Sequence, residues 1–117
     1  MAERFTPEWV EDLDAAVRDL PAADAAFVVQ QVVTDGDDEI AWHLVLGPDG
    51  VRVLAGRADA PDVTFSQDRA TAEAIADGAV SAGAALTAGR LTVRGATARL
   101  TDHREALARI DEALADA

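Results

Sequence analysis

Three strand-like runs joined by two very short turns constrain the fold of this chain more than any other feature. The runs are FVVQQVVT (27–34), EIAWHLVL (39–46) and VRVLAG (51–56), and the turns between them are DGDD and GPDG. Turns of this length and composition connect antiparallel neighbours. The three runs therefore predict a β-meander.

The second run predicts a sheet that is covered on one side only. Every second residue from Ile40 to Leu46 is large and apolar, whereas Glu39, Ala41 and His43 begin the opposite face. This alternation is typical of a strand with one buried and one solvated face. We expect helices over the apolar face.

Two later runs, DVTFS (62–66) and RLTVR (90–94), add a fourth and a fifth strand. Phe65 in the first of them, and Leu91 and Val93 in the second, fall on alternate positions and are expected to face inward. The chain thus predicts a mixed α/β (α+β) fold with a five-stranded, mainly antiparallel sheet covered by helices on one face.

Capping residues and apolar spacing predict the first helix. It begins at Pro7, with Thr6 as its N-cap, and continues to Leu20, where Pro21 ends it. Two shorter helices are expected later, over 68–77 and 81–88.

The later helices have their own capping signals. Ser66 or Asp68 begins the helix over 68–77, and Ser81 caps the helix over 81–88. A last helix is expected from Asp102, where Glu105 stands at capping-box spacing. Its apolar face is expected to carry Leu107, Ile110 and Leu114.

Size and charge limit the classes of function. A chain of 117 residues is expected to form a single domain over 1–117. Its 22 acidic residues against 10 basic ones repel phosphate backbones and anionic lipid surfaces, which argues against nucleic acid and stable membrane insertion as partners. No signal-like or spanning segment is recognised, so a cytoplasmic location is the expectation.

The sequence contains partial matches to catalytic and metal-binding motifs, but each of them lacks a required residue or the required structural context. Ser81 in AVSAG matches a loosened nucleophile elbow, but it follows a helix instead of a strand, so a helix cap is favoured. Gly78 and Gly83 have the spacing of the two glycines in a phosphate loop, but Ala84 and Ala85 stand where that motif needs Lys and then Ser or Thr. His43 and His103 are sixty positions apart, and the chain has no Cys to complete a metal site with them. We expect no enzyme activity, no metal and no cofactor.

Two features leave room for a ligand. Trp42 lies on the inward face of a strand, where an indole is usually core but can also form the wall of an apolar pocket. Nine of the twenty residues from 69 to 88 are Ala, and only Ile75, Val80 and Leu86 are large and apolar. Small side chains either pack helices tightly or leave a void that an apolar molecule can fill.

The segments APDVTFSQDRATAEAIADG and AGRLTVRG resemble the sterol carrier protein 2 (SCP2) sterol-transfer domain family. The resemblance rests on the strand at Asp62 to Phe65, two helices separated at Gly78, and an alternating strand between Gly89 and Gly95, and it extends over nearly the whole chain. It implies an α/β sandwich that encloses an apolar tunnel for fatty acyl chains, sterols or similar lipids. It also implies that the domain has no catalytic residues.

On this reading the chain binds a fatty acid, acyl thioester or sterol-like lipid between sheet and helices. The residues expected to bind it are Trp42, Leu44, Phe65, Leu91 and Val93 on the sheet, and Ile75, Val80, Ala82, Ala85 and Leu86 on the helices.

An alternative is an interaction or accessory module with a filled core, which contacts a protein partner or a second copy of itself. The strongly charged segment after Gly95 keeps this alternative open, because family members often carry an apolar segment there that helps to close the tunnel.

Overall fold

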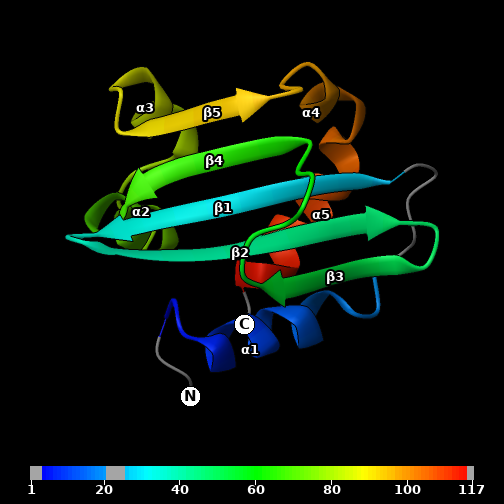
Figure 1. Cartoon of the computed structure of the whole chain (residues 1–117). Helices are drawn as coiled ribbons and strands as arrows, with labels where there is room; N and C mark the ends of the chain where they lie inside the picture. Colours follow the sequence, from blue (N-terminus) through cyan, green and yellow to red (C-terminus); the bar gives the residue numbers. More distant parts are fainter. Residues whose placement is uncertain (1–3, 21–25, 116–117) are drawn as a thin grey trace.

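The computed structural model describes residues 4–20 and 26–115 and consists of one sheet with helices packed against it (Figure 1). The sheet has five strands in the order β3-β2-β1-β4-β5. The strands are β1 (Phe27–Asp35), β2 (Asp38–Gly47), β3 (Gly50–Ala55), β4 (Val63–Asp68) and β5 (Leu91–Gly95). The predicted meander is confirmed, since β1, β2 and β3 are antiparallel neighbours.

The connection from β3 to β4 crosses the sheet instead of turning back beside it. Residues 56–62 pass in front of β2 and β1 in Figure 1, and β4 then runs parallel to β1. Gln30 receives a hydrogen bond on its side-chain oxygen from the amide of Ala58 at 2.8 Å. The amide of Asp62 donates to the carbonyl oxygen of Val28 at 2.9 Å. We call this side of the sheet the outer face.

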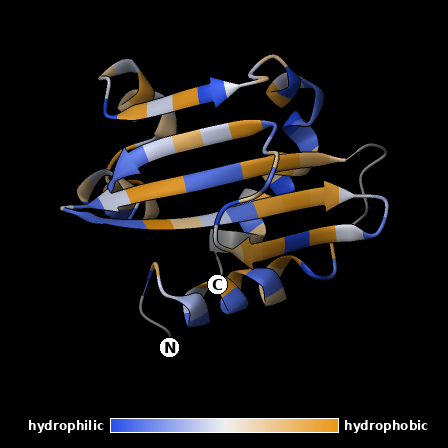
Figure 2. Cartoon of the chain, in the orientation of Figure 1, coloured by the Kyte–Doolittle hydropathy of each residue, from blue (hydrophilic) through white to orange (hydrophobic). Residues whose placement is uncertain are grey.

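The helices α1 (Pro7–Val17), α2 (Arg69–Ala76) and α5 (Arg104–Ala115) contribute residues to the core on the opposite, inner face. α3 (Ala82–Thr87) lies beside β5, and the short α4 (Arg99–Asp102) precedes α5 (Figure 1). Figure 2 shows hydrophobic stretches of β1 and β2 separated by hydrophilic residues.

Three predicted helix caps are confirmed. Thr6 Oγ1 accepts a hydrogen bond from the amide of Trp9 at 3.2 Å, and Ser81 Oγ accepts one from Ala84 at 3.0 Å. Of the two candidates for α2, Asp68 is the cap, because its carboxylate accepts from the amide of Thr71 at 2.7 Å. Each cap satisfies one amide that the first helical turn leaves unpaired.

The C-terminal helix differs from the prediction. It does not begin at Asp102, because α4 already covers that residue and His103 separates α4 from α5. The His103 ring stacks on Phe27 with ring centroids 4.3 Å apart, and the Arg99 guanidinium lies 5.0 Å from the same phenyl ring. These contacts with β1 hold the break between the two helices. The side chain of Leu114 lies outside the described residues.

The first helix is shorter than predicted, because α1 ends at Val17, with Arg18 as its C-cap. Pro21, which was expected to end it, lies outside the described residues. The apolar face of α1 packs into the core as predicted, with Leu13 and Val17 buried and Leu20 packed against the same cluster beyond the helix end.

Asp14 fixes α1 to the edge strand β3. Its carboxylate, which is buried, receives hydrogen bonds from Arg52 Nε, from the amide of Val53 and from Arg18, each at 2.8 Å. The Arg52 hydrogen bond is the largest cause that holds the pKa of Asp14 well below its ordinary value, with Arg18 and Val53 acting in the same direction and burial opposing them. The carboxylate therefore remains ionised and joins the two elements.

Candidate functional site

A cavity of about 420 Å³ lies between the inner face of the sheet and the helices that cover it. We call it the inner cavity. Its walls come from the segment before α1, from α1, α2 and α3, and from strands β1, β2, β4 and β5. The lining residues are Arg4, Phe5, Trp9, Leu13, Gln31, Trp42, Phe65, Gln67, Ala72, Ile75, Ala76, Ala82 and Leu91. Its volume falls in the range of small-molecule sites.

Three aromatic rings form one wall of the inner cavity. The rings of Trp9 and Trp42 meet edge to face with centroids 5.0 Å apart, and Phe5 lies 5.2 Å from Trp9 and 5.8 Å from Trp42. Phe5 also adopts a backbone φ of 64°, which is rare for any residue except glycine. The contacts of its buried ring hold this conformation, and such strain is found most often at functional sites.

Alanines from the helices form another part of the lining. Ala72 and Ala76 of α2 and Ala82 of α3 line the inner cavity together with Ile75. Ala72 is buried, whereas Ala76 and Ala82 are exposed, so the inner cavity can be reached from solvent on their side. The Ala-rich segment therefore leaves open space beside the sheet at these positions.

The structure brings half of the predicted ligand-binding residues together. Trp42, Phe65, Ile75, Ala82 and Leu91 line the inner cavity.

The other five predicted residues do not line it. Ala85 is fully buried, Leu86 is 49% exposed, and Leu44, Val80 and Val93 are partly buried. Leu44 and Val93 pack against the core cluster.

Sequence reasoning missed the N-terminal and the polar parts of the inner cavity. Neither Phe5 nor Trp9 is among the residues that the sequence pattern predicts to bind the ligand. Gln31 could have been found, because it occupies an inward position in the alternation from Phe27 to Val33. Gln67 was missed because the fourth strand was expected to end at Ser66, one residue before it.

Charged side chains near the inner cavity are already paired. Arg4, which lines it, forms an ion pair with Asp77 at 2.8 Å. Arg69 lies 5.5 Å from the centre of the Phe5 ring and forms ion pairs with Asp35 and Glu73. The side-chain amides of Gln31 and Gln67 also line it.

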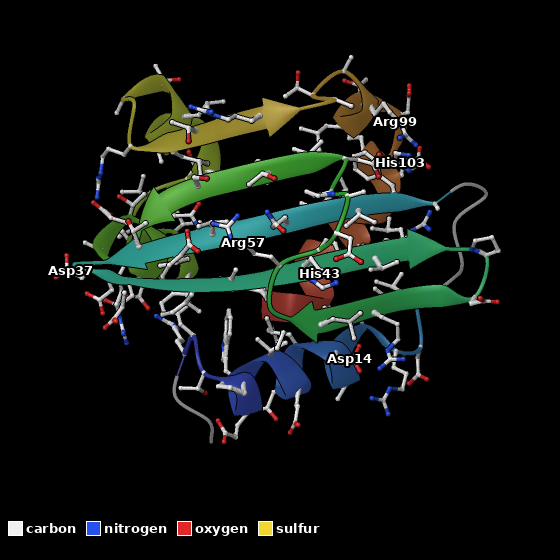
Figure 3. All side chains as sticks on the ribbon, in the orientation of Figure 1. Asp14, Asp37, His43, Arg57, Arg99 and His103 are labelled. Atoms are coloured by element: carbon white, nitrogen blue, oxygen red, sulfur yellow. The ribbon has the colours of Figure 1, made fainter. Side chains whose placement is uncertain are left out.

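The residues considered for catalysis or metal binding lie apart from one another. His43 is on the outer face, where its Nδ1 lies 2.9 Å from the carbonyl oxygen of Gly56, whereas His103 stacks on Phe27 (Figure 3). Ser81 caps α3. Within residues 4–20 and 26–115, no three histidine or acidic side chains come together in a way that could hold a metal ion.

A second hollow, of about 500 Å³, lies between α1 and β3. Asp14, Arg18 and Arg52 line it and already bind one another there. We regard it as part of the contact between α1 and the sheet.

Comparison with known protein families shows the family to which the chain belongs. A sequence model described as the SCP-2 sterol transfer family matches residues 10–108, which is most of the chain. The chain belongs to the SCP-2 sterol transfer family. The resemblance inferred from the sequence is thus confirmed. No curated protein sequence matches the chain closely enough to count as a relative.

Solved structures share the SCP-2 fold over nearly the full chain. A crystal structure of sterol carrier protein 2 is similar with a TM-score of 0.73 and 20% identity, over 97% of this chain and 98% of that chain. A solution structure from Thermus thermophilus, described as possibly a sterol carrier protein, has a TM-score of 0.70 and 20% identity, with 97% and 89% covered. Palmitated SCP2L2 from Aedes aegypti has a TM-score of 0.66 and 21% identity, with 92% and 94% covered.

In the described part of the chain, the helices of this SCP-2 family member are too short or too polar to cross a lipid bilayer.

Proposed function

We propose that this chain is a non-enzymatic binding protein that holds one lipid-like molecule in the inner cavity. The observation that carries the proposal is the inner cavity itself, which is lined by aromatic rings and by alanines. Membership of the SCP-2 sterol transfer family supports a lipid as the ligand. One structure of similar fold is described as palmitated.

Removal of apolar surface from water supplies the binding free energy. Each buried methylene contributes about 0.8 kcal/mol, so eight to ten methylenes contribute roughly 6–8 kcal/mol before the cost of association. Micromolar affinity corresponds to about 8 kcal/mol, so contacts with the aromatic wall have to offset the free energy that association costs. The aromatic wall is buried or partly buried by the protein itself, so it is ordered before the ligand arrives.

Native mass spectrometry tests the proposal. The chain is purified without detergent, and spectra are recorded before and after mixing with palmitic acid, palmitoyl thioester and a sterol. We expect one adduct per chain with at least one of them. If no adduct forms and a fluorescent fatty acyl probe also fails to bind, the ligand proposal is wrong and the interaction module is favoured instead.

A further inference from the structure

Two glutamine side chains interrupt an otherwise apolar inner face. Gln31 of β1 pairs with Trp42 of β2 and Phe65 of β4, and Gln67 of β4 pairs with Leu91 of β5. Both glutamines line the inner cavity. An amide at a position whose neighbours are apolar weakens the core unless something binds it.

The two amides satisfy each other only in part. Gln67 Nε2 donates a hydrogen bond to Gln31 Oε1 at 3.3 Å. Gln67 is only 9% exposed, and its Oε1 is buried with no hydrogen-bond partner among the described residues. The last side-chain torsion of glutamine is broad, so a small rotation can turn this amide toward a molecule in the inner cavity.

Gln30, on the outer face, is a buried glutamine whose amide is hydrogen-bonded within the protein at both ends, and it serves as a comparison for Gln67. Gln30 is 4% exposed, its Oε1 accepts from the amide of Ala58 at 2.8 Å, and its Nε2 donates to Thr64 Oγ1 at 3.4 Å. Both ends of that amide are used within the protein. Gln67 therefore differs from Gln30 in retaining hydrogen-bonding capacity beside a cavity.

We propose that Gln31 and Gln67 make the inner cavity selective for an apolar molecule that carries a neutral hydroxyl group, bound with the hydroxyl inward. This inference rests on the proposed function. A hydroxyl both donates and accepts, so it satisfies the free end of the Gln67 amide in either orientation of that amide. Its apolar remainder then contacts the aromatic wall.

A carboxylate fits the glutamine end of the inner cavity less well. It can only accept hydrogen bonds, and burial of its charge beside neutral amides is unfavourable. The lining cation, Arg4, is already paired with Asp77 and is partly exposed to solvent. An alcohol is therefore preferred over the corresponding acid for the inward position.

Matched ligands and matched variants test this selectivity. Lauryl alcohol and dodecyl fluoride have the same chain, but the fluoride lacks the hydroxyl donor. Both are titrated against a bound fluorescent probe in the unmodified chain and in Gln67→Met and Gln31→Met. Methionine keeps the length of glutamine and removes its amide. We expect the ratio of alcohol to fluoride affinity to fall tenfold or more in Gln67→Met, and the affinity for the fluoride to be retained.

Thermal unfolding provides a second readout for these variants. Gln67→Met removes one long hydrogen bond to Gln31 together with a buried oxygen that has no partner among the described residues. We therefore expect its melting temperature to be unchanged or higher. If the affinity ratio is the same in the unmodified chain and in both variants while the fluoride still binds, the glutamine inference is wrong and the proposed function stands. If neither compound displaces a probe that binds the unmodified chain, only the glutamine inference is wrong. If the fatty acyl probe itself fails to bind, both are wrong.

Discussion

The indole of Trp9, from α1, meets the indole of Trp42, from β2, edge to face with their centroids 5.0 Å apart. Both rings line the inner cavity. Helix α1 and the centre of the sheet therefore share one aromatic wall, and a molecule bound there changes the surroundings of both indoles.

Tryptophan fluorescence should report this shared wall. We expect a saturating fatty acyl ligand to change the emission of both Trp9→Phe and Trp42→Phe, because each variant retains one indole in the lining. The chain contains two tryptophans, so each variant isolates one signal. Unchanged emission in both variants, at concentrations where the ligand is bound, would place the ligand elsewhere.

The carboxylate of Asp14 should stabilise the fold by joining α1 to β3. Asp14→Asn removes the charge that Arg52 and Arg18 bind, and we expect a loss of about 1–3 kcal/mol in the free energy of unfolding. The pKa of Asp14 is lowered in the folded chain. Its contribution is therefore complete above the ordinary pKa of about 4 and is lost as the pH falls below that value.

Urea unfolding of both proteins between pH 7 and pH 2 measures this contribution. The difference between the unmodified chain and Asp14→Asn should be constant near neutral pH and should shrink in acid. A difference that grows as the pH falls would contradict the assigned role.

Gly95 should tolerate a side chain poorly, because β4 approaches it closely. Its φ is 102°, and a Cβ atom there would lie in severe contact with the carbonyl oxygen of Asp62. Gly78 has a φ of 78° but open space around it. We expect Gly78→Ala to cost about 1 kcal/mol through the backbone, and Gly95→Ala to cost roughly 1–3 kcal/mol more. Equal melting temperatures of the two variants would contradict this difference.

Ser81 should act as a helix cap and have no role in catalysis. Ser81→Ala removes the acceptor for the Ala84 amide, so we expect a loss of about 1 kcal/mol in stability. Hydrolysis of a chromogenic ester is expected at the background rate in both proteins. Ester turnover that disappears in Ser81→Ala would overturn this assignment.

Local signals in the sequence predicted most of the fold. The alternation in β1 to β5 and the caps Thr6 and Ser81 depend on residues close to one another in the chain, so the elements follow directly from the pattern. The order β3-β2-β1 could also be predicted, because two very short turns connect strands that are antiparallel neighbours.

Long-range contacts explain what could not be predicted. The break between α4 and α5 depends on the stacking of His103 on Phe27, and these residues lie far apart in the chain. Phe5 adopts its unusual backbone conformation only where Trp9 and Trp42 surround it. The aromatic part of the inner cavity therefore arises from packing of the N-terminal segment on β2, and no local pattern specifies it.

The central claim is that the alanines of α2 and α3 leave space for a ligand. Ala82 lines the inner cavity, whereas Ala85, three residues later on α3, is fully buried and does not line it. Leucine at the first position should occupy space that the ligand needs. Leucine at the second must displace protein neighbours, at a cost of about 1–3 kcal/mol.

Titration of a fluorescent fatty acyl probe into Ala82→Leu and Ala85→Leu, with the melting temperature of each protein, tests this claim most directly. We expect Ala82→Leu to bind the probe at least tenfold more weakly and to melt at or above the temperature of the unmodified chain. We expect Ala85→Leu to melt lower and, below its transition, to bind as the unmodified chain does. Unchanged probe affinity in Ala82→Leu, and in Ala76→Leu from the same wall, would contradict the account.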